Sequence, residues 1–354
     1  AGDSGTGRGP DGDSDDGSMR QAAAYLFVLL PIVLVAVLFS LQNFSQQSSQ
    51  AGGGLIQSNL FQFDFSDYVS LESEISLNRD LVMLYRREGK ARRELLRRYV
   101  MSGYDEDRGF YLDEEMMSQP TRVPDYPVEV RQESYRARQS VSQEYFIVNF
   151  DPGSLVALAD PERIVPLQNW DDSSFVRIYE VESSVSDARA PELVRAPEAL
   201  RGAEWREYYT DYGEDERIRG LAETITADAA TDYDAVDAIL RYLKTEYYYS
   251  LTPGLATNGN QLHHFLFESR KGYCSYYAFS MALMLRSLDI PARVAVGFFV
   301  DADMDVLNFY PVRADQAHAW TEVYFEEYGW VSFDPTSEIL APGETFAPPG
   351  SGGV

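Results

Sequence analysis

The chain has very little cysteine, little histidine and too few basic residues to balance its acids. Its 354 residues include one cysteine, three histidines, and 30 Lys and Arg against 56 Asp and Glu. A single cysteine excludes an intramolecular disulfide. The formal net charge of −26 argues against nucleic-acid binding, because a polyanion would be repelled and no basic patch is visible in the sequence.

One long apolar run without charges, residues 22–41, interrupts this acidic sequence. It is long enough to cross a hydrocarbon core of about 30 Å, and no Ala-x-Ala cleavage site follows it. Arg8 and Arg20 precede the run, whereas the next basic residue after it is Arg79. We therefore expect a transmembrane helix in the lipid bilayer, with the rest of the chain outside the cytoplasm, in the cell envelope.

Composition predicts how the chain is organised around this anchor. Short alternating stretches such as 60–65 and 144–148 predict strands. Because the chain starts at Ala1 without an initiator methionine, a piece of a longer protein is one interpretation. The expected segments are an acidic Gly-rich segment (1–21), the transmembrane helix (22–41), a linker (42–56), a mostly β extracytoplasmic domain (57–204), a catalytic domain (205–340) and a flexible tail (341–354).

Residues 81–100 have an ambiguous pattern. They contain arginines at Arg92, Arg93, Arg97 and Arg98. Charge runs of this kind usually face solvent, so we predict a solvated face here rather than a binding patch.

The single cysteine stands where a helix is expected to begin. Gly272 and Tyr273 precede Cys274, and a run that is apolar on nearly every side continues to Ile290 and Pro291. This pattern predicts a buried helix that ends before the proline. A cysteine in the first turn meets the positive end of the helix dipole, which favours a thiolate. The N–H groups of the same turn could receive an oxyanion.

Three strands are expected after this helix. The β-branched and aromatic run at 292–300 predicts the first, a second begins at His318, and a third spans 330–334. A hairpin of the last two would place His318 beside Asp334. Packing of the helix against this sheet would then bring Cys274 to the imidazole.

Two helices are expected before the cysteine. Apolar residues at helical spacing predict them near 218–225 and 236–243. Thr231 with Asp234 resembles a capping box at the start of the second.

Each candidate residue alone also has an ordinary structural interpretation. A lone cysteine is usually a small buried hydrophobe, a lone histidine a satisfied structural residue, and an Asp-Pro pair a turn. Cys274, His318 and Asp334 together, in this order and with these flanks, favour a nucleophilic triad. In such a triad the carboxylate orients the imidazole, and the imidazole holds the thiol as a thiolate.

Residues 242–337 resemble the transglutaminase-like core of the papain-type fold, especially its bacterial membrane-anchored branch of the TgpA type. The resemblance implies an α+β fold with helices and an antiparallel sheet, preceded here by the mostly β domain and the transmembrane helix. Five ordered blocks carry it: YYYSLTP (247–253), FLFESRKGYC (265–274), LDIPARV (288–294), AHAWTEV (317–323) and GWVSFDPT (329–336).

By this resemblance Cys274 is the nucleophile, His318 the base and acid, and Asp334 the orienting carboxylate. The implied reaction is acyl transfer: the thiolate attacks a glutamine-type amide of a protein or peptide, and the thioester passes to an amine or water. The sequence departs from the pattern at Ser275 and Tyr276, where relatives often carry an acidic residue and then an aromatic or histidine.

Two other functions stay open at this stage. The same triad would serve a cysteine peptidase or amidase that acts on cell-envelope peptides, with water as acceptor. The fold could also be kept as a non-catalytic binding module, although such a module does not need all three residues. The aromatic residue that helps some relatives hold the oxyanion is not assigned among Tyr247, Tyr248 and Tyr249.

We expect no metal or cofactor. The acidic loop 301–305 opens like a calcium loop, but Val306 and Val312 stand where that loop needs Gly and Glu. His263 and His264 lack further ligands at the spacing of a zinc site.

Overall fold

A computed structural model describes residues 79–344, apart from 89–93, 107–108, 117–118, 132, 169–174, 198–201 and 257–259. The predictions for 1–21, 22–41 and 42–56 therefore lie outside the described residues, as do those for 57–78 and 345–354. Among the residues that are described, no helix is long and apolar enough to span a membrane. The chain divides into two compact units, 1–58 and 59–354, and every described residue belongs to the second.

Two antiparallel sheets form the main body of this second unit. A six-stranded sheet has the order β12-β1-β6-β8-β7-β5, and a four-stranded sheet has the order β14-β13-β11-β2. The strands are β1 (Leu81–Arg87), β2 (Glu94–Met101), β3 (Gly103–Asp105), β4 (Gly109–Tyr111), β5 (Val128–Glu129), β6 (Arg138–Ile147), β7 (Pro161–Leu167), β8 (Arg177–Ser186), β9 (Tyr248–Tyr249), β10 (Lys271–Gly272), β11 (Ala292–Val300), β12 (Tyr310–Arg313), β13 (Ala317–Phe325) and β14 (Gly329–Phe333).

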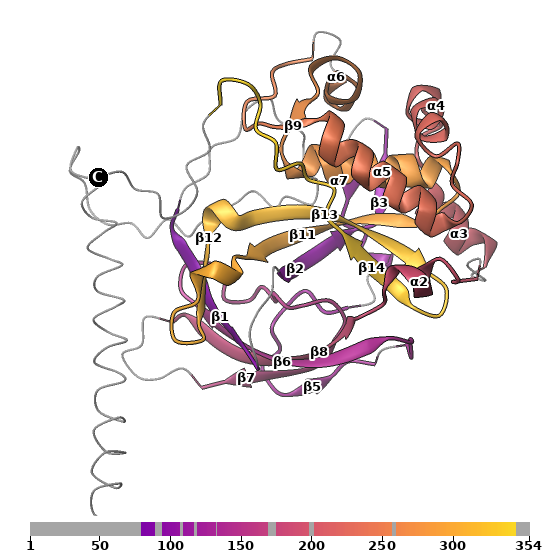
Figure 1. Cartoon of the computed structure of the whole chain (residues 1–354). Coiled ribbons are helices and arrows are strands. Elements are labelled where there is room, and N and C mark those ends of the chain that lie inside the picture. Colours follow the sequence, from indigo (N-terminus) through magenta and orange to yellow (C-terminus); the bar gives the residue numbers. More distant parts are fainter. Residues whose placement is uncertain are drawn as a thin grey trace, which may run out of the picture. The chain divides into compact units, whose positions relative to one another are not determined.

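The helices gather on one face of the four-stranded sheet, and the six-stranded sheet lies on its other side (Figure 1). They are α2 (Ala190–Leu193), α3 (Ala203–Thr210), α4 (Glu216–Ile225), α5 (Asp232–Glu246), α6 (Gln261–His264) and α7 (Cys274–Ser287), with the short turns η1 (Glu114–Met116), η2 (Phe265–Ser269), η3 (Ala302–Met304) and η4 (Ala314–Gln316). The predicted α+β class with helices and antiparallel strands is confirmed.

Helix α7 is the centre of the helical layer. Every residue after Cys274 in α7 is buried, which is why its sequence is apolar on nearly every side. Its hydrophobic partners include α4 and α5 and the facing strands β11 and β13. The Thr321 hydroxyl of β13 donates to the carbonyl oxygen of Ala278 at 3.1 Å. The predicted buried helix is confirmed, as is the Thr231 cap of α5, whose side chain accepts from the N–H of Asp234.

Arg286 joins α7 to three other segments. Its guanidinium donates to the carbonyl oxygens of Ala292, Asp211 and Ser102 at 2.8, 2.9 and 2.6 Å. Burial lowers the pKa of Arg286 to about 10, although nearby acidic groups act in the opposite direction. Carbonyl dipoles therefore satisfy this buried cation, and a polar residue of the helix fixes its place in the fold.

Each of the two sheets contains strands from both halves of the sequence. Strand β2 pairs with β11, and β12 pairs with β1. Hydrogen-bonded strand pairs therefore cross the boundary expected between 57–204 and 205–340. That division stays a prediction, and any test of it by cutting the chain would separate these paired strands.

The prediction of a solvated arginine face is wrong for Arg97. Residues 81–100 contain strands β1 and β2, and Arg97 is only 7% exposed. Its guanidinium forms an ion pair with Glu322, in which Nη1 lies 2.9 Å from Oε1. The partner lies far away in the sequence, so charge patterning within 81–100 could not reveal it. Arg92 and Arg93 lie outside the described residues.

A β-bulge disturbs the pairing of β2 with β11 next to the site described below. The register shifts between Val296 and Gly297, so that Arg98 is the extra residue on β2. A Cβ atom at Gly297 would lie far inside contact distance of the backbone oxygen of Leu96. Glycine is therefore required for this close approach of two backbones. In β13, the residue directly opposite Gly297 is His318.

Candidate active site

Cys274 is the first residue of α7, at the point where the chain turns from a short strand into the helix. Gly272 in β10 pairs with Tyr249, and a Cβ atom there would lie 2.8 Å from the Cβ of Tyr276. Glycine therefore allows the helix to start directly after the strand. Cys274 is a free, half-buried cysteine, and Tyr273 provides no side-chain cap for the first turn. This is the helix start that the sequence predicts.

His318 and Asp334 come from the two strands of the predicted hairpin. Strand β13 carries His318, and Asp334 directly follows β14, which pairs antiparallel with β13. His318 Nε2 lies 3.0 Å from Asp334 Oδ2. The other carboxylate oxygen, Oδ1, accepts a hydrogen bond of 3.1 Å from the N–H of Thr336. Both carboxylate oxygens are thus engaged, and the ring is held by the nitrogen that faces Asp334.

The electrostatics of the pair strongly favour a charged imidazole. Burial acts to lower the pKa of His318, but the Asp334 carboxylate, its hydrogen bond and the nearby Cys274 thiol outweigh burial and raise this pKa to about 10. Because Cys274 contributes both a hydrogen-bond interaction and a charge interaction, its sulfur lies within interaction range of the ring. The structure therefore brings the three predicted residues into one cluster.

Asp334 shows the reciprocal effect. Burial raises its pKa, but attraction to the His318 imidazolium, the hydrogen bond to it and contacts with Thr336 prevail and hold the pKa well below its usual range. The carboxylate is therefore ionised at any pH where the protein would work. It can orient and stabilise an imidazolium without accepting its proton.

The imidazole is shielded from water by aromatic neighbours. His318 is 8% exposed, and its ring lies 5.7 Å from Phe299 and 6.5 Å from Trp320, centroid to centroid. A water-poor environment strengthens the attraction between the ring and Asp334.

Tyr249 is the tyrosine of the 247–249 cluster that lies at this site. Burial raises the pKa of Tyr249 above its usual range, and the charge at Cys274 raises it further. Its phenol is therefore neutral and keeps its proton near the thiol. Tyr247 instead donates to the carbonyl oxygen of Leu266 at 2.9 Å, and Tyr248 is 38% exposed. The sequence contained all three candidates, and tertiary contacts separate them, among them the pairing of Tyr249 with Gly272.

The residues weighed as metal ligands have other partners. Asp301 accepts from the N–H of Asp303 at 3.0 Å, and the Asp305 carboxylate accepts from the N–H of Asn308 at 2.7 Å, as in ordinary turns. His264 Nδ1 lies 2.8 Å from Glu268 Oε2.

His263 also has a carboxylate partner, since its Nε2 contacts Asp215. Within the described part of the chain, no group of three His, Cys, Asp or Glu side chains is placed to hold a metal ion.

Comparison with known proteins places the cluster within a family domain. The model of the transglutaminase-like superfamily matches residues 219–335. Two bacterial relatives match over part of the chain. One is the uncharacterized protein YebA of Bacillus subtilis, 35% identical over 136 residues, which are 36% of this chain and 18% of that protein.

The second relative is the protein-glutamine gamma-glutamyltransferase of Pseudomonas aeruginosa, 35% identical over 150 residues, which are 40% of this chain and 22% of that protein. The chain thus spans about a fifth of the length of these two relatives.

A solved structure extends the likeness beyond residues 219–335. The periplasmic domain of TgpA from Pseudomonas aeruginosa, bound to ethylmercury, superposes with a TM-score of 0.52 at 24% identity, covering 73% of this chain and 90% of that one. A second structure of that domain gives a TM-score of 0.51 at 22% identity, covering 75% and 94%. These likenesses show the fold. Residues 219–335 match the transglutaminase-like superfamily, and the resemblance found in the sequence is confirmed.

Proposed function

We propose that the chain is a transglutaminase-like cysteine enzyme that transfers the acyl group of a glutamine-type amide through a thioester on Cys274. The observation that carries the proposal is the His318–Asp334 contact of 3.0 Å beside the cysteine that begins α7. A non-catalytic module would have no need for a buried imidazolium held next to a free thiol.

In the first half of the reaction, the Cys274 thiolate attacks the carboxamide carbon, and its sulfur forms a bond to that carbon. His318, protonated because its pKa is raised to about 10, gives its proton to the departing nitrogen as the C–N bond breaks. Ammonia leaves, and the acyl group remains on the sulfur as a thioester.

In the second half, a primary amine attacks the thioester carbon. His318 is now neutral, takes a proton from the attacking nitrogen, and the C–S bond breaks to regenerate the thiolate and imidazolium pair. Water in place of the amine would give the carboxylic acid by the same steps. Asp334 keeps the ring oriented through both halves.

The oxyanion that forms on the amide carbonyl needs hydrogen-bond donors. Two sources stand near Cys274: the backbone N–H groups in the first turn of α7 and the neutral phenol of Tyr249.

We further propose that the catalytic domain works outside the cytoplasm, anchored to the lipid bilayer by residues 22–41. The uncharged run and the basic residues before it support the anchor. The superposed TgpA domain is periplasmic in its source organism, which supports the location. The proposed partners are proteins or peptides with an accessible amide.

The test is incubation of the full chain with a glutamine-containing peptide and a labelled primary amine, followed by mass spectrometry of the peptide. Incorporation of the amine at glutamine supports the transferase. Conversion of glutamine to glutamate shows the same thioester passing to water.

Cleavage of the peptide backbone would replace the transferase with the peptidase alternative. If neither reaction occurs and a thiol reagent fails to label Cys274, the binding module is the better interpretation.

A further inference from the structure

A small pocket rich in arginine lies between the two sheets of this acidic protein. Arg97 and Arg98 of β2 and Arg293 of β11 line it, together with Gln119 and Thr121 of a covering loop. Such a concentration of positive charge is unexpected in a chain with a net charge of −26.

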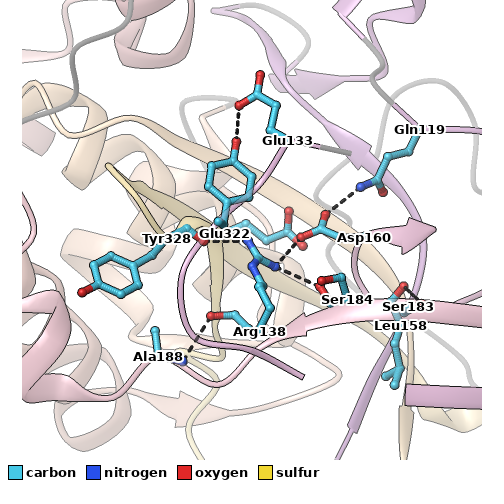
Figure 2. Close-up of polar contacts among 12 residues, drawn as sticks. Gln119, Glu133, Arg138, Leu158, Asp160, Ser183, Ser184, Ala188, Glu322 and Tyr328 are labelled. Carbon is cyan, nitrogen blue, oxygen red and sulfur yellow. Dashed lines mark hydrogen bonds and ion pairs between the residues drawn. The ribbon is translucent and has the colours of Figure 1, made fainter. Parts of the chain in front are cut away.

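The deep side of the pocket is an ionic network with more cations than anions. Arg97 and Arg293 share the carboxylate of Glu322, at N–O distances of 2.9 and 2.7 Å. Arg97 also approaches Asp160 at 3.5 Å, and Asp160 pairs with Arg138 at 2.6 Å. Figure 2 shows the Arg138 guanidinium beside Asp160, with Gln119 reaching the same carboxylate. Three guanidinium groups thus share two carboxylates.

Arg98 adds a further positive charge at the pocket wall. It is the extra residue of the bulge on β2. Its Nη1 donates a hydrogen bond of 2.9 Å to the carbonyl oxygen of Thr121. Among the residues that the structure describes, no carboxylate forms an ion pair with Arg98. Burial lowers the pKa of Arg98 and outweighs the opposing effects of Tyr99 and of the Asp151 carboxylate. The wall therefore presents a partly desolvated cation.

The remaining walls are apolar. Leu155, Ala157, Leu158 and Pro161 are among the residues that line them. Apolar walls exclude water from the arginines and strengthen their attraction for an anion. The guanidinium fork matches the geometry of a carboxylate or phosphate, because it offers two parallel N–H donors.

We propose that this pocket binds a compact oxyanion, a carboxylate or phosphate group, in contact with Arg98 and its neighbours. This goes beyond the proposed acyl transfer and does not depend on it. The excess positive charge, the bulge that presents Arg98 and the apolar walls together favour an anionic ligand over a purely structural role.

The pocket lies on the same face of the sheet as the catalytic candidate His318 but apart from it. Arg97 is opposite Gly297, and Gly297 is opposite His318, so the backbones of Arg97 and His318 are two strand spacings apart, roughly 10 Å. A bound anion would therefore contact the sheet that carries His318, about two strands away from the backbone of His318.

The test is calorimetric titration of the full chain with inorganic phosphate and, separately, with succinate, each at constant ionic strength set with sodium chloride. We expect saturable binding of at least one anion. Arg98→Gln should weaken it about tenfold or more, because a charge-assisted hydrogen bond is lost. Arg163→Gln removes the same charge from an exposed position on β7 and should leave the affinity unchanged.

The two titrations distinguish a phosphate ligand from a carboxylate ligand. Binding of phosphate alone assigns a phosphate ligand, and binding of succinate alone assigns a carboxylate. The proposal is overturned if neither anion saturates, or if Arg98→Gln binds as tightly as the wild type. Should Arg98→Gln fail to fold, Arg98→Lys decides instead, since it keeps the charge but loses the fork: an unchanged affinity would reject the site, and a severalfold weaker one supports it.

Discussion

His318 and Asp334 stabilise each other's charge across the β13–β14 hairpin, with Nε2 3.0 Å from Oδ2. The carboxylate raises the pKa of the imidazole, and the imidazolium lowers the pKa of the carboxyl. Because Nε2 faces Asp334, the opposite ring nitrogen is the one proposed to serve the thiol. This one pair sets both the protonation state and the orientation of His318, the proposed catalytic base.

The nucleophile and the orienting acid should differ in how much activity they control. Cys274→Ala removes the attacking atom, so turnover should vanish while the domain still folds, since a small residue fits the helix start. Asp334→Asn keeps the nucleophile, and kcat should fall by a smaller factor, on the order of 10²–10⁴. Amine incorporation measures both variants, and thermal unfolding shows that they remain folded. Full turnover in Cys274→Ala would reject the mechanism.

Much of this site could be predicted from the sequence. The helix after Cys274, the strand at 292–300 and the hairpin that joins His318 to Asp334 follow from local patterns of apolar residues, glycine and proline. These patterns extend over a few residues, and the structure repeats them with small shifts at the ends.

The rest depended on contacts between residues far apart in the sequence. Arg97 looked like part of a solvated face, yet it pairs with Glu322 in another strand. Tyr249 could be chosen over Tyr247 and Tyr248 only from tertiary contacts such as the pairing of β9 with β10. Local pattern says which side of a strand a residue occupies, but tertiary packing decides what lies there.

The His318–Asp334 pair should stabilise the fold in a defined pH window. The pKa of His318 is raised from 6.5 to about 10, so its contribution is fully present below pH 6.5 and is lost as the pH rises through about 10. Asp334 stays ionised throughout this range because its pKa is lowered.

The measurement is the difference in melting temperature between the wild type and Asp334→Asn across this window. We expect the difference to be largest near pH 6 and to shrink as the pH approaches 10. A difference that stays constant from pH 6 to 10 would show that the charge of His318 does not stabilise the folded state.

Tyr249 should contribute to catalysis through its hydroxyl. If its phenol donates to the oxyanion, Tyr249→Phe should lower kcat by roughly 10- to 100-fold and change KM little, because the interaction forms in the transition state. Tyr248→Phe changes the same group on an exposed neighbour and should leave kcat unchanged. If kcat of Tyr249→Phe equals that of the wild type, the hydroxyl does not contribute to catalysis and the tyrosine only packs in the site.

The bulge beside His318 should make Gly297 intolerant of any side chain. Because a Cβ there would meet the backbone oxygen of Leu96, Gly297→Ala should destabilise the fold by about 3 kcal/mol. Gly220→Ala is the matched control at an exposed position of α4, where nothing lies within 4 Å of the added Cβ, and it should stabilise by about 0.5–1 kcal/mol. Urea unfolding measures the change in the free energy of unfolding for both variants, which should fall in Gly297→Ala and rise in Gly220→Ala. Equal changes in the two variants would contradict this account of the bulge.

Glu322 should be the most costly carboxylate to neutralise outside the candidate active site. It is 1% exposed and faces the guanidinium groups of Arg97 and Arg293, so Glu322→Gln leaves two buried cations without their shared anion. Removing one partner of a buried pair costs about 3–5 kcal/mol, even though the intact pair adds little over apolar packing.

Glu223→Gln removes the same charge from an exposed i,i+4 pair with Arg219 and should cost less than about 1 kcal/mol. Denaturant unfolding at neutral pH compares the two variants directly. If Glu322→Gln costs no more than Glu223→Gln, the Glu322 carboxylate does not stabilise the fold through Arg97 and Arg293. The arginines would then be satisfied by groups other than this carboxylate.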